Sequence, residues 1–176
     1  MKAGKFLVSK DYNKNFSSKN ISAEDNFLKN CLSLTISKSS HVAYDDMYEG
    51  LKLNLANTTN KEIPFNTQDN KLYMKLQAKD KYGNWKDIEY IENSFCGNSY
   101  YPITLDKKTC WSFAIPVFEG EFKTVMRAEL QYSNPDNRIE YYKLYSNEVE
   151  CSINPGQFWR NGSQFSNGIM YPRWGN

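Results

Sequence analysis

Hydrophobic and polar residues alternate with a period of two through most of the middle of the chain. This alternation is typical of β-strands with one face buried and the other in solvent. Turn-forming sequences such as DKYGN and SNPDNR separate the alternating segments. The segments that show it most clearly are CLSLTIS (31–37), GLKLNL (50–55), LYMKLQAK (72–79), CWSFAIPVF (110–118) and TVMRAELQY (124–132).

The pattern predicts about seven or eight short strands and no helix long enough to connect parallel neighbours. We therefore expect an all-β protein, an antiparallel two-sheet immunoglobulin-like sandwich that spans residues 31–154. Residues 1–30 form an irregular N-terminal arm, and residues 155–176 form an aromatic-rich C-terminal tail. A small closed barrel is the alternative, because strand counting does not distinguish open sheets from closed ones.

Composition supports a β-protein and excludes some classes of partner. The chain has 13 Tyr, 10 Phe and 4 Trp, and aromatic residues favour half-buried pleated surfaces. Its 22 Lys and Arg nearly balance 20 Asp and Glu, so no strong field attracts nucleic acid. No apolar run approaches the roughly 18 residues of a membrane-spanning helix. We expect neither nucleic-acid binding nor a membrane-spanning segment.

The four cysteines are expected to form two disulfide bonds, Cys96–Cys110 and Cys31–Cys151. The first bond would close the loop GNSYYPITLDKKT, and the second would join the first and last strands of the sandwich. An even cysteine count in a β-rich chain suits an oxidising compartment. Four buried free thiols in a cytoplasmic protein are the main alternative. The spacing does not match a zinc site, because paired Cys-x-x-Cys motifs are absent.

The sequence contains no arrangement typical of an enzyme. The acidic segment YDDMYEG lacks the spacing of a calcium-binding EF-hand loop. His41, the single histidine, has no neighbouring partner for acid–base chemistry. Nucleophile-elbow, phosphate-binding and dinucleotide motifs are also absent. We expect a non-enzymatic protein without a cofactor or metal.

Aromatic residues gather in the aperiodic tail and in one loop, which makes them candidate partner-binding residues. Tyr and Trp combine apolar area with a polar group and are enriched at interfaces. Folding of the tail over an open side of the sandwich is the alternative interpretation. The candidates are Phe158, Trp159, Phe165, Tyr171 and Trp174 in the tail, and Tyr100 and Tyr101 in the loop.

Several short motifs resemble a group of uncharacterised bacterial proteins with immunoglobulin-like domains. These motifs are NxTNK, DKxGxW, CGNSY, EGEFKT and YSNE…SINPGQF, which together cover about residues 50–158. The resemblance implies a sandwich in an envelope or secreted protein, with no assigned activity. A fainter similarity to the bacterial intracellular proteinase-inhibitor domain rests on the strand, turn and hairpin pattern and identifies no inhibitory residue.

Together these observations predict a non-catalytic binding or structural module. We expect it in the bacterial periplasm, on the outer surface or secreted, with a cytoplasmic location as the alternative. Its partner would be a protein, or a glycan, bound through the aromatic tail and loops. The competing hypothesis is a protease inhibitor or immunity-type protein that presents the rigid 96–110 loop.

Overall fold

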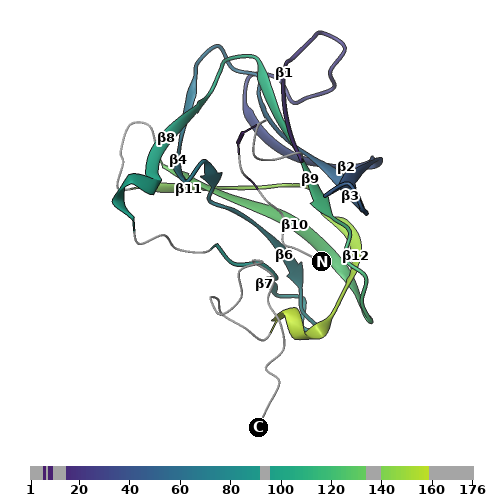
Figure 1. The fold of residues 1–176 in the computed structure, drawn as a ribbon. Helices are drawn as coiled ribbons and strands as arrows, with labels where there is room; N and C mark the ends of the chain where they lie inside the picture. Colours follow the sequence, from purple (N-terminus) through teal and green to yellow (C-terminus); the bar gives the residue numbers. More distant parts are fainter. Residues whose placement is uncertain (1–5, 7, 10–14, 92–95, 134–139, 159–176) are drawn as a thin grey trace.

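The structure, a computed structural model, describes residues 6, 8–9, 15–91, 96–133 and 140–158. The described residues form twelve β-strands and two short 3-10 segments, and no α-helix occurs among them. All strand pairs are antiparallel (Figure 1). The prediction of an all-β antiparallel sandwich is confirmed.

One layer of the sandwich is a four-stranded sheet. Its spatial order is β1 (Phe16–Asn20), β9 (Thr109–Pro116), β3 (Tyr48–Asn57) and β2 (Leu32–Tyr44). β2 and β3 form a long hairpin whose register shifts between Ser37 and His41. β9 is buried along its whole length, since β1 and β3 pair with it on either side.

Two further sheets, one of three strands and one of five, complete the sandwich, where a single second sheet was predicted. The three-stranded sheet has the order β5 (Lys71–Leu72), β4 (Ile63–Gln68) and β8 (Tyr100–Leu105). The five-stranded sheet has the order β11 (Tyr141–Tyr145), β10 (Phe122–Ser133), β6 (Met74–Lys79) and β7 (Trp85–Asp87), and β12 (Val149–Ile153) also pairs with β10. All three sheets are open.

The chain passes directly from the three-stranded to the five-stranded sheet at Tyr73. Leu72 pairs with β4, whereas Met74 pairs with β10. Both side chains are buried, so the alternating pattern continues without interruption across the change of sheet. The backbone carbonyl of Tyr73 accepts a hydrogen bond of 2.9 Å from the Gln131 N–H.

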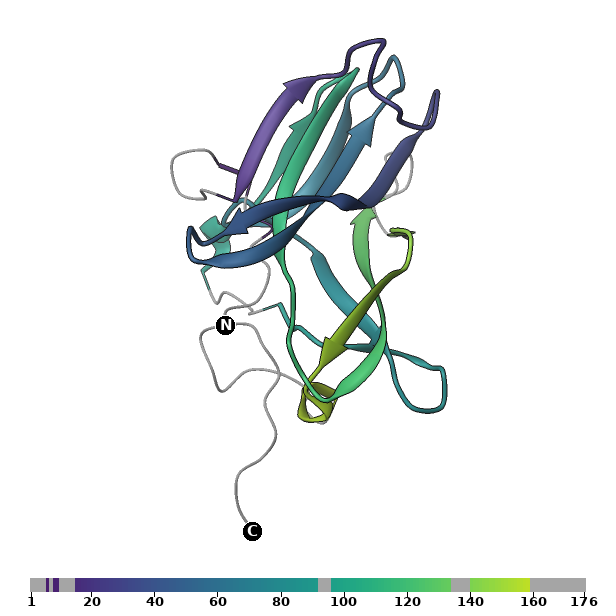
Figure 2. The same ribbon diagram turned by 90° about the vertical axis from the view of Figure 1, so that its right-hand side faces the viewer.

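Figure 2 gives a second view of how the strands are arranged. Side chains from all three sheets share one hydrophobic core. The four-stranded sheet contributes Leu53 and Phe113, the three-stranded sheet Phe65, and the five-stranded sheet Leu76 and Leu130. The Phe65 and Trp111 rings lie 5.9 Å apart and join two of the sheets. Burial of these groups supplies most of the driving force for folding.

The segment predicted as an N-terminal arm is integrated into the sandwich. Residues 16–20 form β1, which pairs with β9, and Phe6 is buried against Phe113 with a ring separation of 5.8 Å. The carbonyl of Phe6 also accepts a hydrogen bond of 3.0 Å from the Leu72 N–H. The described N-terminal residues therefore contribute to the core.

Two turns, of which DKYGN was predicted, have clear physical causes. In DKYGN, the Asp80 carboxylate accepts hydrogen bonds from the backbone N–H groups of Tyr82 and Asn84, each 2.9 Å long. Gly83 has a φ of 81°, a value that favours glycine. The acidic segment YDDMYEG forms the turn between β2 and β3, where the φ values of Asp45 and Asp46 are positive.

No helix in the described ranges has both the length and the hydrophobicity that crossing a bilayer requires.

Candidate functional site

The cysteines do not form the predicted disulfide bonds; none of the four is bridged. Cys110 lies in the middle of the four-stranded sheet, opposite Ala56, whereas Cys96 is exposed before the 3-10 segment Gly97–Ser99. Cys151 is in β12, opposite Thr124 of β10 in the five-stranded sheet. The Cys31–Cys151 pairing was wrong because the last strand joins β10 and does not run beside the first strand.

This correction removes the main physical argument for an oxidising compartment, since that argument depended on the disulfides. Burial raises the pKa of Cys151 to about 11 and also raises the pKa of Cys110. Both thiols therefore stay protonated at neutral pH and behave as small apolar groups.

Most of the predicted tail site lies outside the described residues, namely Trp159, Phe165, Tyr171 and Trp174. Phe158 is described, at the end of the 3-10 segment Pro155–Phe158. Its ring packs edge-on against Phe122 at 5.8 Å, next to the hydrophobic core. For this residue the structure favours the packing role over a free partner-binding surface.

Tyr100 and Tyr101 begin strand β8 and are not part of a bridged loop. Their side chains are 46% and 39% exposed. They lie in one wall of a pocket of about 490 Å³ at the junction of the three-stranded and five-stranded sheets. The pocket is lined by Asn66, Thr67, Tyr73, Tyr100, Tyr101, Pro102, Gln131, Tyr132, Ser133 and Tyr141.

Strand pairing brings these distant residues together. In the three-stranded sheet Thr67 pairs with Tyr101, and in the five-stranded sheet Ser133 pairs with Tyr141. The Asn66 amide nitrogen donates a hydrogen bond of 2.6 Å to the Ser133 hydroxyl, which links the two sheets at the pocket. The pocket is therefore formed by the three-stranded and five-stranded sheets together, and no single strand forms it.

An aromatic chain anchors the inner wall of the pocket in the core. The buried Phe65 ring lies 5.7 Å from the Tyr132 ring, and Tyr132 lies 5.6 Å from Tyr142. Thr67 is buried, and its hydroxyl donates a hydrogen bond of 2.6 Å to the Tyr101 carbonyl. These contacts hold the wall in place before a ligand arrives, which lowers the entropic cost of binding.

The described lining contains no Asp, Glu, Lys, Arg or His. Burial raises the pKa of Tyr73, with further contributions from the neighbouring phenols of Tyr100 and Tyr141. Burial and the Tyr142 phenol raise the pKa of Tyr132 in the same way. The phenols of Tyr73 and Tyr132 are thus neutral at physiological pH, and each can donate and accept a hydrogen bond.

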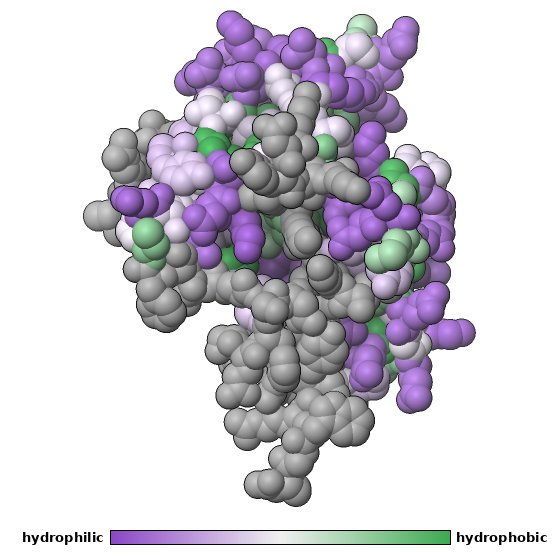
Figure 3. Space-filling model, in the orientation of Figure 1, coloured by the Kyte–Doolittle hydropathy of each residue, from purple (hydrophilic) through white to green (hydrophobic). Residues whose placement is uncertain are grey.

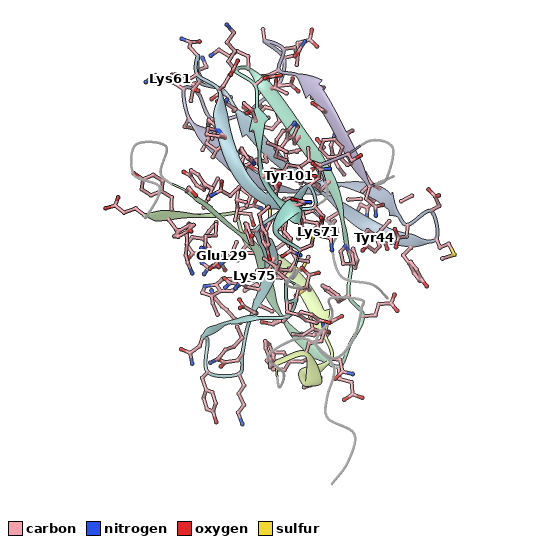
Figure 4. All side chains as sticks on the ribbon, turned by 60° about the vertical axis from the view of Figure 1, so that its left-hand side comes forward. Tyr44, Lys61, Lys71, Lys75, Tyr101 and Glu129 are labelled. Atoms are coloured by element: carbon pink, nitrogen blue, oxygen red, sulfur yellow. The ribbon has the colours of Figure 1, made fainter. Side chains whose placement is uncertain are left out.

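The charged groups gather instead on the outer face of the five-stranded sheet. Glu129 is 3% exposed and lies 3.6 Å from the Lys75 ammonium and 3.3 Å from that of Lys143 (Figure 4). The Arg127 guanidinium lies between the rings of Trp85 and Tyr145, at 4.1 and 3.8 Å from their centroids. The charged groups of Glu129 and Arg127 on this face are thus paired, through ion pairs and cation–π contacts.

The acidic and histidine candidates lie against neighbouring polar groups. Asp45 accepts a hydrogen bond of 3.0 Å from the Asn15 amide, and His41 forms an exposed ion pair with Glu49. Among the described residues, no group of three or more His, Cys, Asp or Glu side chains could hold a metal ion. Lys75 and the Gln77 amide each contact both Glu129 and Asp87, and so lie between these two carboxylates.

Sequence reasoning identified only part of this pocket. Tyr100 and Tyr101 were predicted, but Tyr73, Tyr132 and Tyr141 were read as ordinary strand residues. The sequence does show an unusual number of tyrosines near the ends of the predicted strands. It does not show which strand ends come together in the fold to form a pocket.

Comparisons of the chain with protein-family models, with curated proteins and with solved structures find no match.

Proposed function

We propose that the protein is a non-catalytic binding module whose ligand docks in the tyrosine-lined pocket. The main support is the pocket itself, in which five tyrosines and four polar side chains converge without a charged group. Its volume of about 490 Å³ falls within the roughly 300–1,000 Å³ of typical ligand sites. Few charges and many aromatic groups are usual in sites that bind without chemistry.

The visible surface gives little support to a purely hydrophobic interface. In its described part, the face in Figure 3 is mostly hydrophilic, with small scattered hydrophobic areas. Large docking interfaces usually present a wider apolar patch. On the described part of this face, the figure therefore supports no wide apolar interface.

The hypothesis of a protease inhibitor depended on a rigid 96–110 loop closed by a disulfide bond, and that bond is absent. The proposed binding role does not require this loop. The segment expected to form a rigid bridged loop consists instead of β8, a turn and the start of β9, without a disulfide.

The proposal can be tested by adding a set of small neutral fragments, aromatic and polar, and following the amide chemical shifts of the protein by NMR. We expect saturable shifts around Tyr101, Gln131 and Ser133. The Tyr101→Ala variant should lose most of this response, because one wall of the pocket is removed. Tyr82→Ala is the matched control, since Tyr82 is 76% exposed and lies in the β6–β7 turn, outside the pocket.

Unchanged spectra outside the pocket would show that Tyr101→Ala remains folded. If no fragment produced shifts at the pocket, or if the hits responded equally in both variants, the proposed binding role of this pocket would be rejected.

A further inference from the structure

The polar groups of the pocket offer both donors and acceptors. Gln131 is half-buried and lines the pocket, and its side-chain amide carries both donors and an acceptor. Asn66 uses its amide nitrogen on Ser133 and keeps its carbonyl oxygen as an acceptor. A ligand that buries these amides must supply groups of both kinds, because unsatisfied buried polar groups are costly.

The aromatic groups of the pocket offer flat apolar faces beside those amides. Tyr141 is 58% exposed, and Tyr101 is more than one-third exposed on the opposite wall. Tyr132 also lines the pocket, and its ring packs against the buried Phe65 ring of the core. Such rings suit a ligand with an apolar face and a rim of hydrogen-bonding groups.

We propose that the pocket binds an uncharged oligosaccharide, of about two or three hexose units given the usual sizes of ligand sites. This inference rests on the proposed function and names its ligand. A pyranose ring presents C–H groups on one face and hydroxyls around its edge, and each hydroxyl both donates and accepts. Those properties match the phenol faces and the amides of Asn66 and Gln131.

The lining disfavours two other ligand classes. A charged ligand would lose its hydration without gaining an ionic partner, since the described lining contains no ionised side chain. A proline-rich peptide also packs on aromatic grooves, but proline has no N–H group. Such a peptide would leave the acceptor oxygens of Asn66 and Gln131 without donors.

The experiment titrates the full chain with maltotriose, cellotriose and mannotriose, while amide shifts are followed by NMR. Lactose and sialyllactose compare a neutral disaccharide with the same disaccharide extended by a negatively charged sugar, and a decaproline peptide tests the competing class. At least one neutral trisaccharide should shift Tyr101 and Gln131 saturably, and lactose should bind more tightly than sialyllactose.

Three variants define which contacts matter. Tyr101→Ala should weaken sugar binding at least about tenfold, and Tyr101→Phe, which keeps the ring, should retain most of it. Gln131→Met should also weaken sugar binding about tenfold, because a side chain of similar size loses both its donor and its acceptor. Tyr82→Ala should bind as the unmodified chain does.

The outcomes separate this inference from the proposed function. Pocket shifts with decaproline alone, or tighter binding of sialyllactose than lactose, would overturn the neutral-glycan inference and leave a binding pocket in place. A pocket that responds to no sugar, to no peptide and to none of the neutral fragments would overturn both.

Discussion

Individual amide side chains, rather than disulfides, connect the sheets of this protein. The fully buried Asn57 donates hydrogen bonds to the carbonyls of Lys61, Leu105 and Asp106, at 2.8, 3.3 and 3.1 Å. Asn147 bonds both the N–H and the carbonyl of Ile36, at 2.8 and 3.1 Å, and so joins the two layers. The sequence showed abundant Asn, but an Asn-rich composition predicts turns and does not distinguish these bridging residues.

Replacing Asn57 with alanine should lower the free energy of unfolding by about 3 kcal/mol, because several buried backbone groups lose their partner together. Urea unfolding is the measurement, and the midpoint should fall while the m-value stays constant. Asn98→Ala, in the exposed 3-10 segment, is the control and should change stability by less than about 0.5 kcal/mol. Equal effects in the two variants would contradict the assigned role of Asn57.

The thiols should differ in reactivity at pH 8. Since burial raises the pKa of Cys151 to about 11 and raises that of Cys110, their thiolate fractions fall and their alkylation slows. Cys96 is exposed and should be alkylated first by iodoacetamide in the native protein. Mass spectrometry of the native protein would give the order in which the cysteines are alkylated. The same measurement on the unfolded, unreduced protein would give the total number of reactive thiols.

Unfolding without reductant should make all four thiols reactive. Fewer than four alkylated cysteines in the unfolded, unreduced protein would contradict the unbridged state.

At the scale of strands, much of the fold could be predicted from the sequence. Period-two alternation located β3, β6, β9 and β10, and Gly83 with its neighbours located the β6–β7 turn. The third sheet could not be predicted, because Leu72 and Met74 continue one alternating pattern while their strands join different partners. The contribution of residues 16–20 was also missed, since polar residues dominate that short edge strand.

The turn before β10 contains a position that only glycine can occupy without movement of the chain. A Cβ atom at Gly120 would lie 2.1 Å from the Ile153 carbonyl carbon and 2.4 Å from the Asn154 nitrogen. Gly120→Ala should therefore force β10 and β12 apart and destabilise the protein by at least about 2 kcal/mol. Gly97→Ala is the matched control, because no described atom beyond its two chain neighbours lies within 4 Å of its added Cβ.

The measurement is the melting temperature of each glycine variant in thermal unfolding, and Gly120→Ala should melt at a lower temperature than Gly97→Ala. A melting temperature for Gly120→Ala as high as that for Gly97→Ala would show that the β10–β12 pairing is looser than described.

At the scale of the whole molecule, the candidate site depends on contacts between distant parts of the chain. Tyr101 and Tyr141 are 40 positions apart in sequence, and each reaches the pocket through the register of its own sheet. Local patterns identify tyrosines but not these registers, so only the Tyr100–Tyr101 part was predicted. The disulfide prediction failed for the same reason, since it required a strand order that the sequence does not specify.

Ligand binding by the pocket should be nearly independent of pH between about 5 and 9, because its described lining has no Asp, Glu, Lys, Arg or His side chain. The raised pKa values of Tyr73 and Tyr132 keep these phenols neutral throughout that range and beyond the ordinary tyrosine pKa. Binding should weaken only when the phenols ionise at more alkaline pH. Titration of the best-binding trisaccharide at several pH values is the measurement, and a transition near pH 6.5 would contradict this description.

The passage of the backbone between two sheets at Tyr73 has a mechanical consequence. A molecule held by β8 on one side and by β10 and β11 on the other would fasten two sheets whose shortest covalent connection is one residue long. Such a brace would slow hydrogen exchange in both sheets at once, far from the atoms that it touches.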